Sequence, residues 1–339
     1  MPRSVLIVKL AAIGDVAMAL PMITALRSEN TQKHITWLCG TIAAPLLRCV
    51  DGIEDVIAID EAAVLAGNRA RKAQAVMAAW SALRGKRFDL VLTAHTDSRY
   101  RLFGAGVRAT ERRWLGERGA RSRLVAGRYY GDEYVRLATE VDDGTARRFA
   151  PPPLRVELDR GVGERLARLD ARAPVALAPG GARNPGRDDP LRRWPVERYA
   201  EVARELVRRG RTVLLTGAPN DAWIRPAFEG IDVVDLVGAT TLPGLVALYA
   251  RCGVVVTHDS GPLHLARLSG APLVGLFGPT SPASMLREDA RTIALWPGAM
   301  LPCAPCYDGR NFAPCGDNVC MQHIGSNDVV ARVDALLAR

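Results

Sequence analysis

Residues 4–40 read SVLIVKLAAIGDVAMALPMITALRSENTQKHITWLCG, and this stretch decides the fold class. An apolar run is followed by a helical pattern and then by a second apolar run, and the alternation continues through a long Ala-rich helix predicted from Ala62 to Leu83. The apolar runs do not alternate with polar residues, which is typical of strands covered by helices on both faces. We therefore predict an α/β fold with a parallel, doubly wound sheet.

The same alternation starts again after a proline-rich break. Residues 147–153 read RRFAPPP, and consecutive prolines continue neither a helix nor a sheet interior. A new series of apolar runs follows, and we predict two Rossmann-like domains that face each other across a cleft. The predicted boundaries are residues 1–150 for the first domain, 151–172 for a linker, 173–325 for the second domain, and 326–339 for a final helix that packs back on the first domain.

Composition places the chain among folded, enzyme-sized proteins. It has 339 residues, of which 48% are hydrophobic and 24% charged, and no stretch approaches the ~18 uninterrupted apolar residues of a membrane span. A basic residue before an apolar run makes the N-terminus resemble a signal peptide, but Lys9 and Asp15 interrupt that run. We therefore expect a cytoplasmic protein with reduced thiols.

The strand-to-helix loops are where a ligand is expected. No Gly-x-Gly-x-x-Gly follows the first strand and no phosphate loop ending in Gly-Lys-Ser/Thr occurs, which argues against a dehydrogenase or a P-loop enzyme. Ligands of open α/β sheets bind beyond the carboxyl ends of the strands. In the first such loop, AAIGDVA, Asp15 is either a helix N-cap or a general base that accepts a proton from a sugar hydroxyl.

Two loops of the second half predict an anion site. In THDSGPLHLA (residues 257–266) a strand end runs into a helix that starts near Pro262, and the free amides of such a helix start bind phosphate, although a purely structural cap is the alternative. After the first strand of this half come Gly180 and Gly181, and then Arg192 before Trp194. A guanidinium at this position neutralises a departing diphosphate, or is simply a solvated side chain.

The positive charge is concentrated in one segment. The net charge is +9, and residues 99–128 hold nine arginines against Glu111 and Glu117, whereas Lys occurs only at positions 9, 33, 72 and 86. Such a segment suits a polyanionic partner such as nucleic acid, anionic lipid or a phosphorylated glycan, or it is a solvated surface.

Four of the seven cysteines cluster near the C-terminus, in CAPCYDGRNFAPCGDNVC. In a reducing compartment this spacing suggests a structural zinc or iron site, with free thiols or a redox disulfide as alternatives. The candidate ligands are Cys303, Cys306, Cys315 and Cys320.

Four motifs together resemble glycosyltransferase family 9, the ADP-heptose:lipopolysaccharide heptosyltransferases. They are, in order, VKLAAIGDV, RRWP, DSGPLHLA and GLFGPTSP, and they span nearly the whole chain. The resemblance implies a GT-B fold, with an acceptor in the N-terminal half and a nucleotide sugar in the C-terminal half. It also implies an inverting transfer that requires no metal or other cofactor.

The resemblance assigns roles to individual residues. Asp15 matches the catalytic base, and Arg192 stands where the family usually has Lys, next to the leaving diphosphate. The residues expected to bind the donor, ADP-heptose, are Gly180, Gly181, Arg192, Gly217, Thr240, Asp259, Ser260, Gly261 and His264. The basic segment gives a separate hypothesis: Arg99, Arg101, Arg112 and Arg113, with Lys9, are expected to bind an anionic glycolipid acceptor at the inner face of the inner membrane.

Three other functions stay open at this point. The first is a GT-B transferase that uses another nucleotide sugar or a protein acceptor. The second is a nucleic-acid or polyanion-binding module, although 6% aromatic residues and no stacking motif of RNA readers argue against nucleic acid. The third is a nucleotide-binding regulator without turnover.

Overall fold

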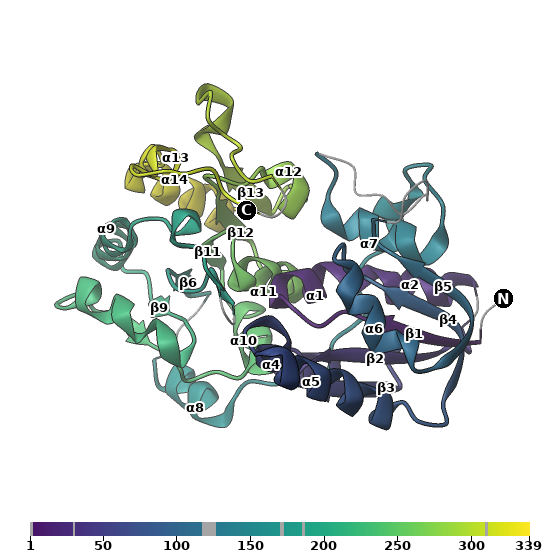
Figure 1. Ribbon diagram of the computed structural model, residues 1–339. Coiled ribbons are helices and arrows are strands. Elements are labelled where there is room, and N and C mark those ends of the chain that lie inside the picture. Colours follow the sequence, from purple (N-terminus) through teal and green to yellow (C-terminus); the bar gives the residue numbers. More distant parts are fainter. Residues whose placement is uncertain (1–2, 30, 117–126, 170–172, 185–186, 309–310) are drawn as a thin grey trace. The chain divides into compact units, whose positions relative to one another are not determined.

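The computed structural model describes residues 3–29, 31–116, 127–169, 173–184, 187–308 and 311–339 (Figure 1). The chain divides into two compact units. The first unit contains Met1–Arg155 with Asn184–Arg187, and the second contains Val156–Arg183 with Asp188–Arg339. None of the described helices is long and apolar enough to cross a membrane.

The first unit is built on a parallel five-stranded sheet with the order β3-β2-β1-β4-β5. Its strands are β1 (Ser4–Val8), β2 (His34–Gly40), β3 (Asp55–Ile59), β4 (Arg87–Thr93) and β5 (Arg108–Trp114). The central strand β1 is buried from Val5 onward, which explains why its sequence is continuously apolar. From β1 the strand order runs through β2 and β3 on one side and through β4 and β5 on the other. The loop after β1 therefore lies where the strand order reverses.

Helices connect these strands on the two faces of the sheet. They are α1 (Ile13–Ala19), α2 (Pro21–Glu29), α3 (Ala44–Leu47), α4 (Glu61–Leu65), α5 (Arg69–Ala82), α6 (Arg101–Ala105) and α7 (Tyr130–Thr139), with short 3-10 turns at Ser98–Tyr100 and Thr145–Arg148. The single helix predicted from Ala62 to Leu83 is in fact two helices. Asn68 caps the second one, its side chain accepting a hydrogen bond from the Arg71 N–H at 3.0 Å, and this cap separates α4 from α5.

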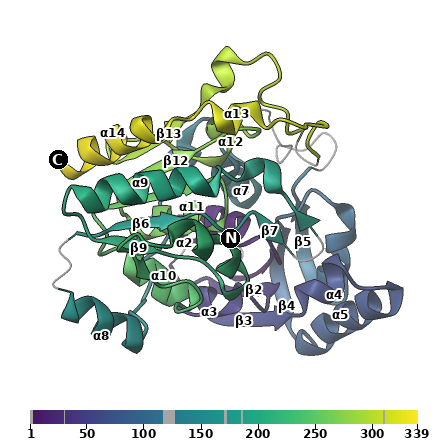
Figure 2. The same cartoon turned by 90° about the vertical axis from the view of Figure 1, so that its left-hand side faces the viewer.

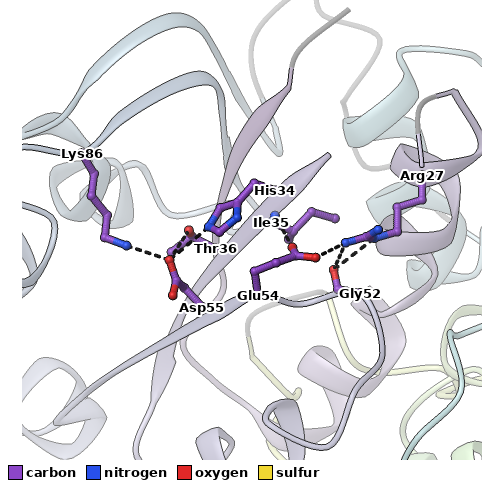
Figure 3. Close-up of polar contacts among 8 residues, drawn as sticks. All are labelled: Arg27, His34, Ile35, Thr36, Gly52, Glu54, Asp55 and Lys86. Carbon is purple, nitrogen blue, oxygen red and sulfur yellow. Dashed lines mark hydrogen bonds and ion pairs between the residues drawn. The ribbon is translucent and has the colours of Figure 1, made fainter. Parts of the chain in front are cut away.

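Polar contacts fasten the amino ends of these strands (Figure 3). Glu54 accepts a hydrogen bond from the backbone N–H of Ile35 and pairs with Arg27. Asp55 pairs with Lys86 at 2.7 Å and with His34 at 3.1 Å, and these contacts lower the pKa of the Asp55 carboxyl, the hydrogen bond from Lys86 most of all. These contacts lie at the edge opposite the loops expected to bind a ligand.

The second unit repeats the topology with one more strand. Its sheet is parallel with the order β10-β9-β6-β11-β12-β13. The strands are β6 (Val175–Ala178), β9 (Val213–Leu215), β10 (Val234–Asp235), β11 (Val254–His258), β12 (Leu273–Leu276) and β13 (Thr292–Leu295). A two-residue pair, β7 (Arg183–Asn184) and β8 (Arg187–Asp188), forms a separate ribbon.

The helices of this unit enclose a core that includes two large aromatic residues. They are α8 (Arg160–Arg168), α9 (Val196–Arg208), α10 (Leu242–Tyr249), α11 (Gly261–Ser269), α12 (Pro282–Met285), α13 (Val319–Gln322) and α14 (Ser326–Leu337), with 3-10 segments η3 (Pro190–Arg192), η4 (Pro219–Phe228) and η5 (Pro297–Met300). The Trp194 and Tyr199 rings meet edge to face with centroids 4.8 Å apart, and both side chains are buried.

The final helix corrects one prediction. We expected it to pack back on the first domain, but α14 lies beside α9 in the second unit, as Figure 2 shows. Its buried side chains, among them Val329 and Val333, belong to the core of that unit, and Asp334 forms an ion pair with Arg209 of the α9 C-cap. An apolar stripe on a terminal helix predicts that the helix docks, but not on which domain.

Candidate active site

The candidate site of the second unit lies at the carboxyl ends of its central strands. The loops after β6, β9, β10 and β11 all leave the same edge of a parallel sheet, and they carry most of the residues that the sequence assigned to the donor. The others are Arg192 in η3, just before α9, and Gly261 and His264 in α11. Each of these positions is therefore near the crevice where α/β sheets bind ligands.

Asp259, directly after β11, is the centre of this site. Its side chain is 1% exposed, one oxygen lies 3.0 Å from a guanidinium nitrogen of Arg192, and the other accepts a hydrogen bond from Thr280 Oγ1 at 2.7 Å. Burial alone would raise the pKa of Asp259, but the charges of Arg192 and His264 hold it below its ordinary value. A buried and ionised Asp259 orients these cations and is not itself exposed to a ligand.

Arg192 and His264 give the site its positive side. Arg192 is mostly buried, and its Nε makes no hydrogen bond to a described residue, so part of its donor capacity is unused. His264 Nε2 lies 4.0 Å from the Asp259 carboxylate. Both lie next to the first turn of α11, where Pro262 fits a backbone with free amides. This arrangement can bind a phosphate group.

A glycine loop closes the other side of this anion site. Gly181 has φ +84°, and a Cβ there would lie 3.3 Å from the Ser260 side chain, so this backbone runs against the start of α11. Its N–H donates to Asp221 Oδ1 at 3.0 Å, and its carbonyl accepts from Arg193 Nε at 3.0 Å. The loop is therefore held on both of its backbone groups.

The sequence interpretation overlooked Asp221 and Arg193. Asp221 is buried in η4, and its second oxygen accepts the N–H of Ala218, in the loop after β9, at 2.9 Å. A Cβ on Gly180 would lie 2.3 Å from the Asp221 carboxyl carbon, and one on Gly217 would lie 3.0 Å from its Cβ. The glycines that we assigned to the ligand thus make room for Asp221. The only available signal was an acidic residue in the first turn after TGAP.

The remaining predicted donor residues lie as follows. Gly261 is the first residue of α11, and the buried Ser260 donates its hydroxyl to the carbonyl of His258 at 3.2 Å. Thr240 lies in the loop before α10, but the cap of that helix is Thr241, whose Oγ1 accepts the N–H of Gly244. Ser260 and Thr241 therefore already hold the backbone locally.

A second, buried layer of hydrogen-bonded residues supports these strand ends. His258 is fully buried, its Nδ1 is hydrogen-bonded to the Tyr199 hydroxyl at 3.2 Å, and burial lowers its pKa to about 3. Tyr249 is hydrogen-bonded to Thr216 in the same way, and burial raises its pKa. Both side chains are neutral near pH 7 and support the strand ends that carry the site.

The first unit contributes one accessible carboxylate at the corresponding loop. Asp15 is not the N-cap of α1, a position occupied by Ala12, but lies in the first turn with its side chain 35% exposed. Its Oδ2 is 3.0 Å from Lys9 Nζ, and Lys9 is only 3% exposed. A carboxylate held in place and open to solvent is what a general base requires.

Aromatic residues surround this pair, and the sequence interpretation overlooked them. Lys9 Nζ lies 5.2 Å from the centroid of the Tyr134 ring, and the imidazole of His95 stacks on Tyr100 at 3.7 Å. Burial, with the charge of Lys9 as a second cause, holds the pKa of His95 well below its ordinary value. The neutral His95 accepts the N–H of Leu10 through Nε2, which fixes the end of β1 beside Lys9.

Comparison with known proteins decides the family. The model of glycosyltransferase family 9 (heptosyltransferase) matches residues 155–311. Lipopolysaccharide core heptosyltransferase OpsX of Haemophilus influenzae is 23% identical, with 92% of each chain covered. Lipopolysaccharide heptosyltransferase 2 of Escherichia coli is 28% identical over 87% of this chain and 88% of the relative. The chain belongs to glycosyltransferase family 9.

A solved structure extends the comparison to the fold. The E. coli heptosyltransferase WaaC with ADP matches with a TM-score of 0.70 at 18% identity, over 98% of this chain and 99% of that one. The family 9 chain is therefore a glycosyltransferase with the GT-B fold, as the motifs predicted.

The arginines predicted to bind the acceptor of this family 9 enzyme fall into two groups. Arg112 donates to the carbonyl of Gly104, and Arg113 donates to that of Ala138 and pairs with Glu111, so both hold the backbone of the first unit together. Arg99 is 78% exposed beside Asp97, and the guanidinium of Arg101 lies 3.8 Å above the Trp114 ring. Arg99 and Arg101 remain available to an acceptor.

The remaining predictions for this enzyme concern Lys9, the other clustered arginines and the linker. Lys9 is buried and pairs with Asp15, and its role toward the acceptor stays a prediction. Three of the nine clustered arginines, at positions 118, 121 and 123, lie outside the described residues, as do residues 170–172 of the predicted linker.

The cysteine segment carries four free thiols. Cys303, Cys306, Cys315 and Cys320 are free thiols, and no three His, Cys, Asp or Glu side chains of the described residues gather so as to hold a metal ion. The segment instead packs beside the loop that carries Thr280, since the N–H groups of Cys306 and Tyr307 donate to the Pro279 carbonyl. The zinc or iron site stays a prediction.

Proposed function

We propose that this enzyme transfers a heptose from ADP-heptose to a lipopolysaccharide core acceptor, with inversion and without a metal, at the cytoplasmic face of the inner membrane. The observation that carries the proposal is the buried set of Asp259, Arg192 and His264 at the start of α11. It is a site for the diphosphate of a nucleotide sugar, built entirely from protein cations and amides.

The second unit supplies stabilisation of the leaving group. As the bond between the anomeric carbon and the diphosphate breaks, negative charge develops on the phosphate oxygens. Arg192, held by Asp259, and the amides of the first turn of α11 are in place before the reaction, so they stabilise this charge without reorganising.

The first unit supplies the base. In the proposed reaction Asp15 accepts the proton of the acceptor hydroxyl, whose oxygen attacks the anomeric carbon from the side opposite to the diphosphate. One displacement of this kind inverts the configuration at that carbon. Lys9 and the neutral His95 keep Asp15 and the end of β1 in position.

The relatives support the choice of substrates. The solved heptosyltransferase WaaC was obtained with ADP, and the two relatives described above are named for heptose transfer to lipopolysaccharide. Heptose as the sugar and lipopolysaccharide as the acceptor are therefore the first substrates to test. Arg99 and Arg101 are the exposed cations proposed to meet phosphates of such an acceptor.

A calorimetric titration of ADP-heptose against other nucleotide sugars, followed by product analysis by NMR, tests the proposal. We expect tightest binding and turnover with ADP-heptose, an inverted anomeric linkage, and unchanged rates in a chelator. Asp15→Asn should lower kcat by about 10²- to 10⁴-fold while the Kd of ADP-heptose is unchanged, and Asp60→Asn, which removes only a helix cap charge, should leave kcat unaltered. Turnover with another nucleotide sugar alone, or full activity of Asp15→Asn, would refute it.

A further inference from the structure

The outer face of α5 exposes apolar side chains that the core does not use. Met77 is 65% exposed, Trp80 41%, and Leu102 of the neighbouring α6 is 52% exposed. These three residues are called the α5 patch. The inner face of the same helix is already buried through Ala75, Ala79 and the adjoining Leu83. The patch is therefore additional to the packing that holds α5 on the sheet.

The α5 patch is one continuous and fixed surface. Met77 and Trp80 are three residues apart on a helix, so they share a face. The indole N–H of Trp80 donates to the carbonyl of Leu102 at 2.7 Å, and a Cβ on Gly106 would lie 2.7 Å from the indole ring. Contacts thus fix the ring of Trp80 while much of it faces solvent.

Basic residues flank the patch at both ends. Between Glu61 and Asp89 the chain has six basic residues and no acidic one. Arg69 and Arg71 lie at the start of α5, and Arg84 and Arg87 follow its end. Lys86 is engaged by Asp55, but these four arginines form no ion pair with another described residue.

The pairing of β4 with β5 adds a further arginine to this group of unpaired positive charges. Arg87 of β4 lies opposite Arg108 of β5, and both are exposed. Like charges directly opposite each other destabilise a sheet unless an anion lies close to both. The surface near the end of α5 is therefore suited to a multiply anionic partner.

We propose that the α5 patch and its arginines dock the protein on an anionic lipid bilayer. Trp at the boundary between apolar and polar surroundings, flanked by Arg, is typical of surfaces that lie in the membrane interface. An acidic protein would pair with the arginines but would leave the exposed Met and Leu unexplained. The benefit of such docking, access to a lipid-anchored acceptor, rests on the proposed function, whereas the surface itself does not include the candidate active site.

Vesicle sedimentation tests the docking. We expect the protein to sediment with phosphatidylcholine vesicles that contain phosphatidylglycerol and not with phosphatidylcholine alone. Arg84→Gln with Arg87→Gln should weaken the partition by roughly five-fold for each charge removed, and Met77→Ser with Leu102→Ser should weaken it further. Sedimentation of these variants at the level of the unchanged protein would overturn the proposal.

Matched variants in the second unit control for a general effect of composition. Met300→Ser removes a methionine that is 77% exposed, and Arg204→Gln with Arg251→Gln removes two exposed arginines that form no ion pair with a described residue. We expect none of these to change vesicle binding, and thermal unfolding of all variants shows that they fold. Equal loss in these controls would overturn the assignment to α5.

Quenching of tryptophan fluorescence by brominated lipid locates the contact. We expect quenching to fall in Trp80→Phe and to persist in Trp223→Phe, which changes a ring of similar exposure, 42%, in the second unit. The reverse pattern would overturn the proposal. So would a dimer in the absence of vesicles that Met77→Ser dissociates, because the patch would then be covered by a second copy.

Activity separates this proposal from the proposed function. Patch variants should lose transfer to an acceptor embedded in vesicles and keep transfer to a delipidated acceptor. If the unchanged protein binds vesicles through Trp80 but transfers heptose to neither acceptor, the proposed function fails and the docking surface stands. If the patch variants transfer to both acceptors at the unchanged rate, the docking proposal fails alone.

Discussion

The two units share a strand order but organise their charged residues in opposite ways. In the second unit Asp259, Arg192 and His264 form one buried set, and Asp221 and Arg193 hold the glycine loop beside it. In the first unit Arg99 and Arg101 are exposed; Arg99 pairs with Asp97, and the guanidinium of Arg101 lies over the Trp114 ring. The second unit is thus organised before a ligand arrives, which suits the nucleotide sugar that we propose for it, whereas the exposed cations of the first unit suit the larger acceptor that we propose.

The largest effect is expected at Arg192, because the preorganised charge of the second unit depends on it. Arg192→Gln should lower kcat by about 10²- to 10³-fold. Arg192→Lys should restore only part of the rate, because an ammonium cannot bind Asp259 and a phosphate with the same planar geometry. Steady-state kinetics with Arg204→Gln as the control measure this. A variant Arg192→Gln with normal kcat would show that the buried set is merely structural.

A smaller effect is expected at Asp221, which acts through the backbone of two loops. Asp221→Ala removes the acceptor of the Gly181 and Ala218 N–H groups. The unpaired groups should lower the free energy of unfolding by about 1–3 kcal/mol, and the displaced loop should raise the KM of the donor while kcat changes less. Denaturant unfolding measures the free energy of unfolding, and steady-state kinetics measure the donor KM. Asp232→Ala, at an exposed position, is the control. A normal donor KM would remove Asp221 from the positioning of the site.

How much of this comparison was predictable depends on the type of interaction. Apolar runs and helix starts are local, so the two parallel α/β sheets, the helix start after β11 and the place of Asp15 after the first strand were predicted from the sequence. The partners of Asp221 and Arg112 were not predicted, because they are backbone groups, which have no sequence signature. The break between α4 and α5 was missed because the Ala-rich pattern continues across Asn68.

The buried histidine of the second unit predicts a pH dependence of stability. The pKa of His258 is lowered to about 3, so the folded state keeps it neutral. Below the unfolded pKa of about 6.5, the unfolded state binds one more proton than the folded state. The free energy of unfolding should therefore fall by about 1.4 kcal/mol for each unit by which the pH is lowered, until the pH reaches the folded pKa. Urea unfolding at several pH values between 7 and 4 gives the free energy of unfolding as a function of pH. This free energy should change less with pH in His258→Gln than in the exposed control His323→Gln. Equal slopes would contradict the burial of a neutral imidazole.

The smallest effect is expected from the arginines of the first unit. Arg112→Gln should lower the free energy of unfolding by about 1 kcal/mol, because it removes a charged donor from backbone carbonyls. Arg99→Gln, at an exposed pair, should change stability by less than about 0.5 kcal/mol but raise the acceptor KM. Thermal unfolding and acceptor kinetics on both variants distinguish a structural cation from a binding one. A reversed result would mean that the two roles are exchanged.

The placement of the few lysines has a practical consequence. Lys9 is enclosed beside Asp15, and Lys33 is equally enclosed, with its Nζ donating to the carbonyl of Leu26. Reagents that acylate amines should therefore react, apart from the N-terminus, at Lys72 and Lys86, at opposite ends of α5. A dye attached there, without any engineered cysteine, would report on the surroundings of that helix.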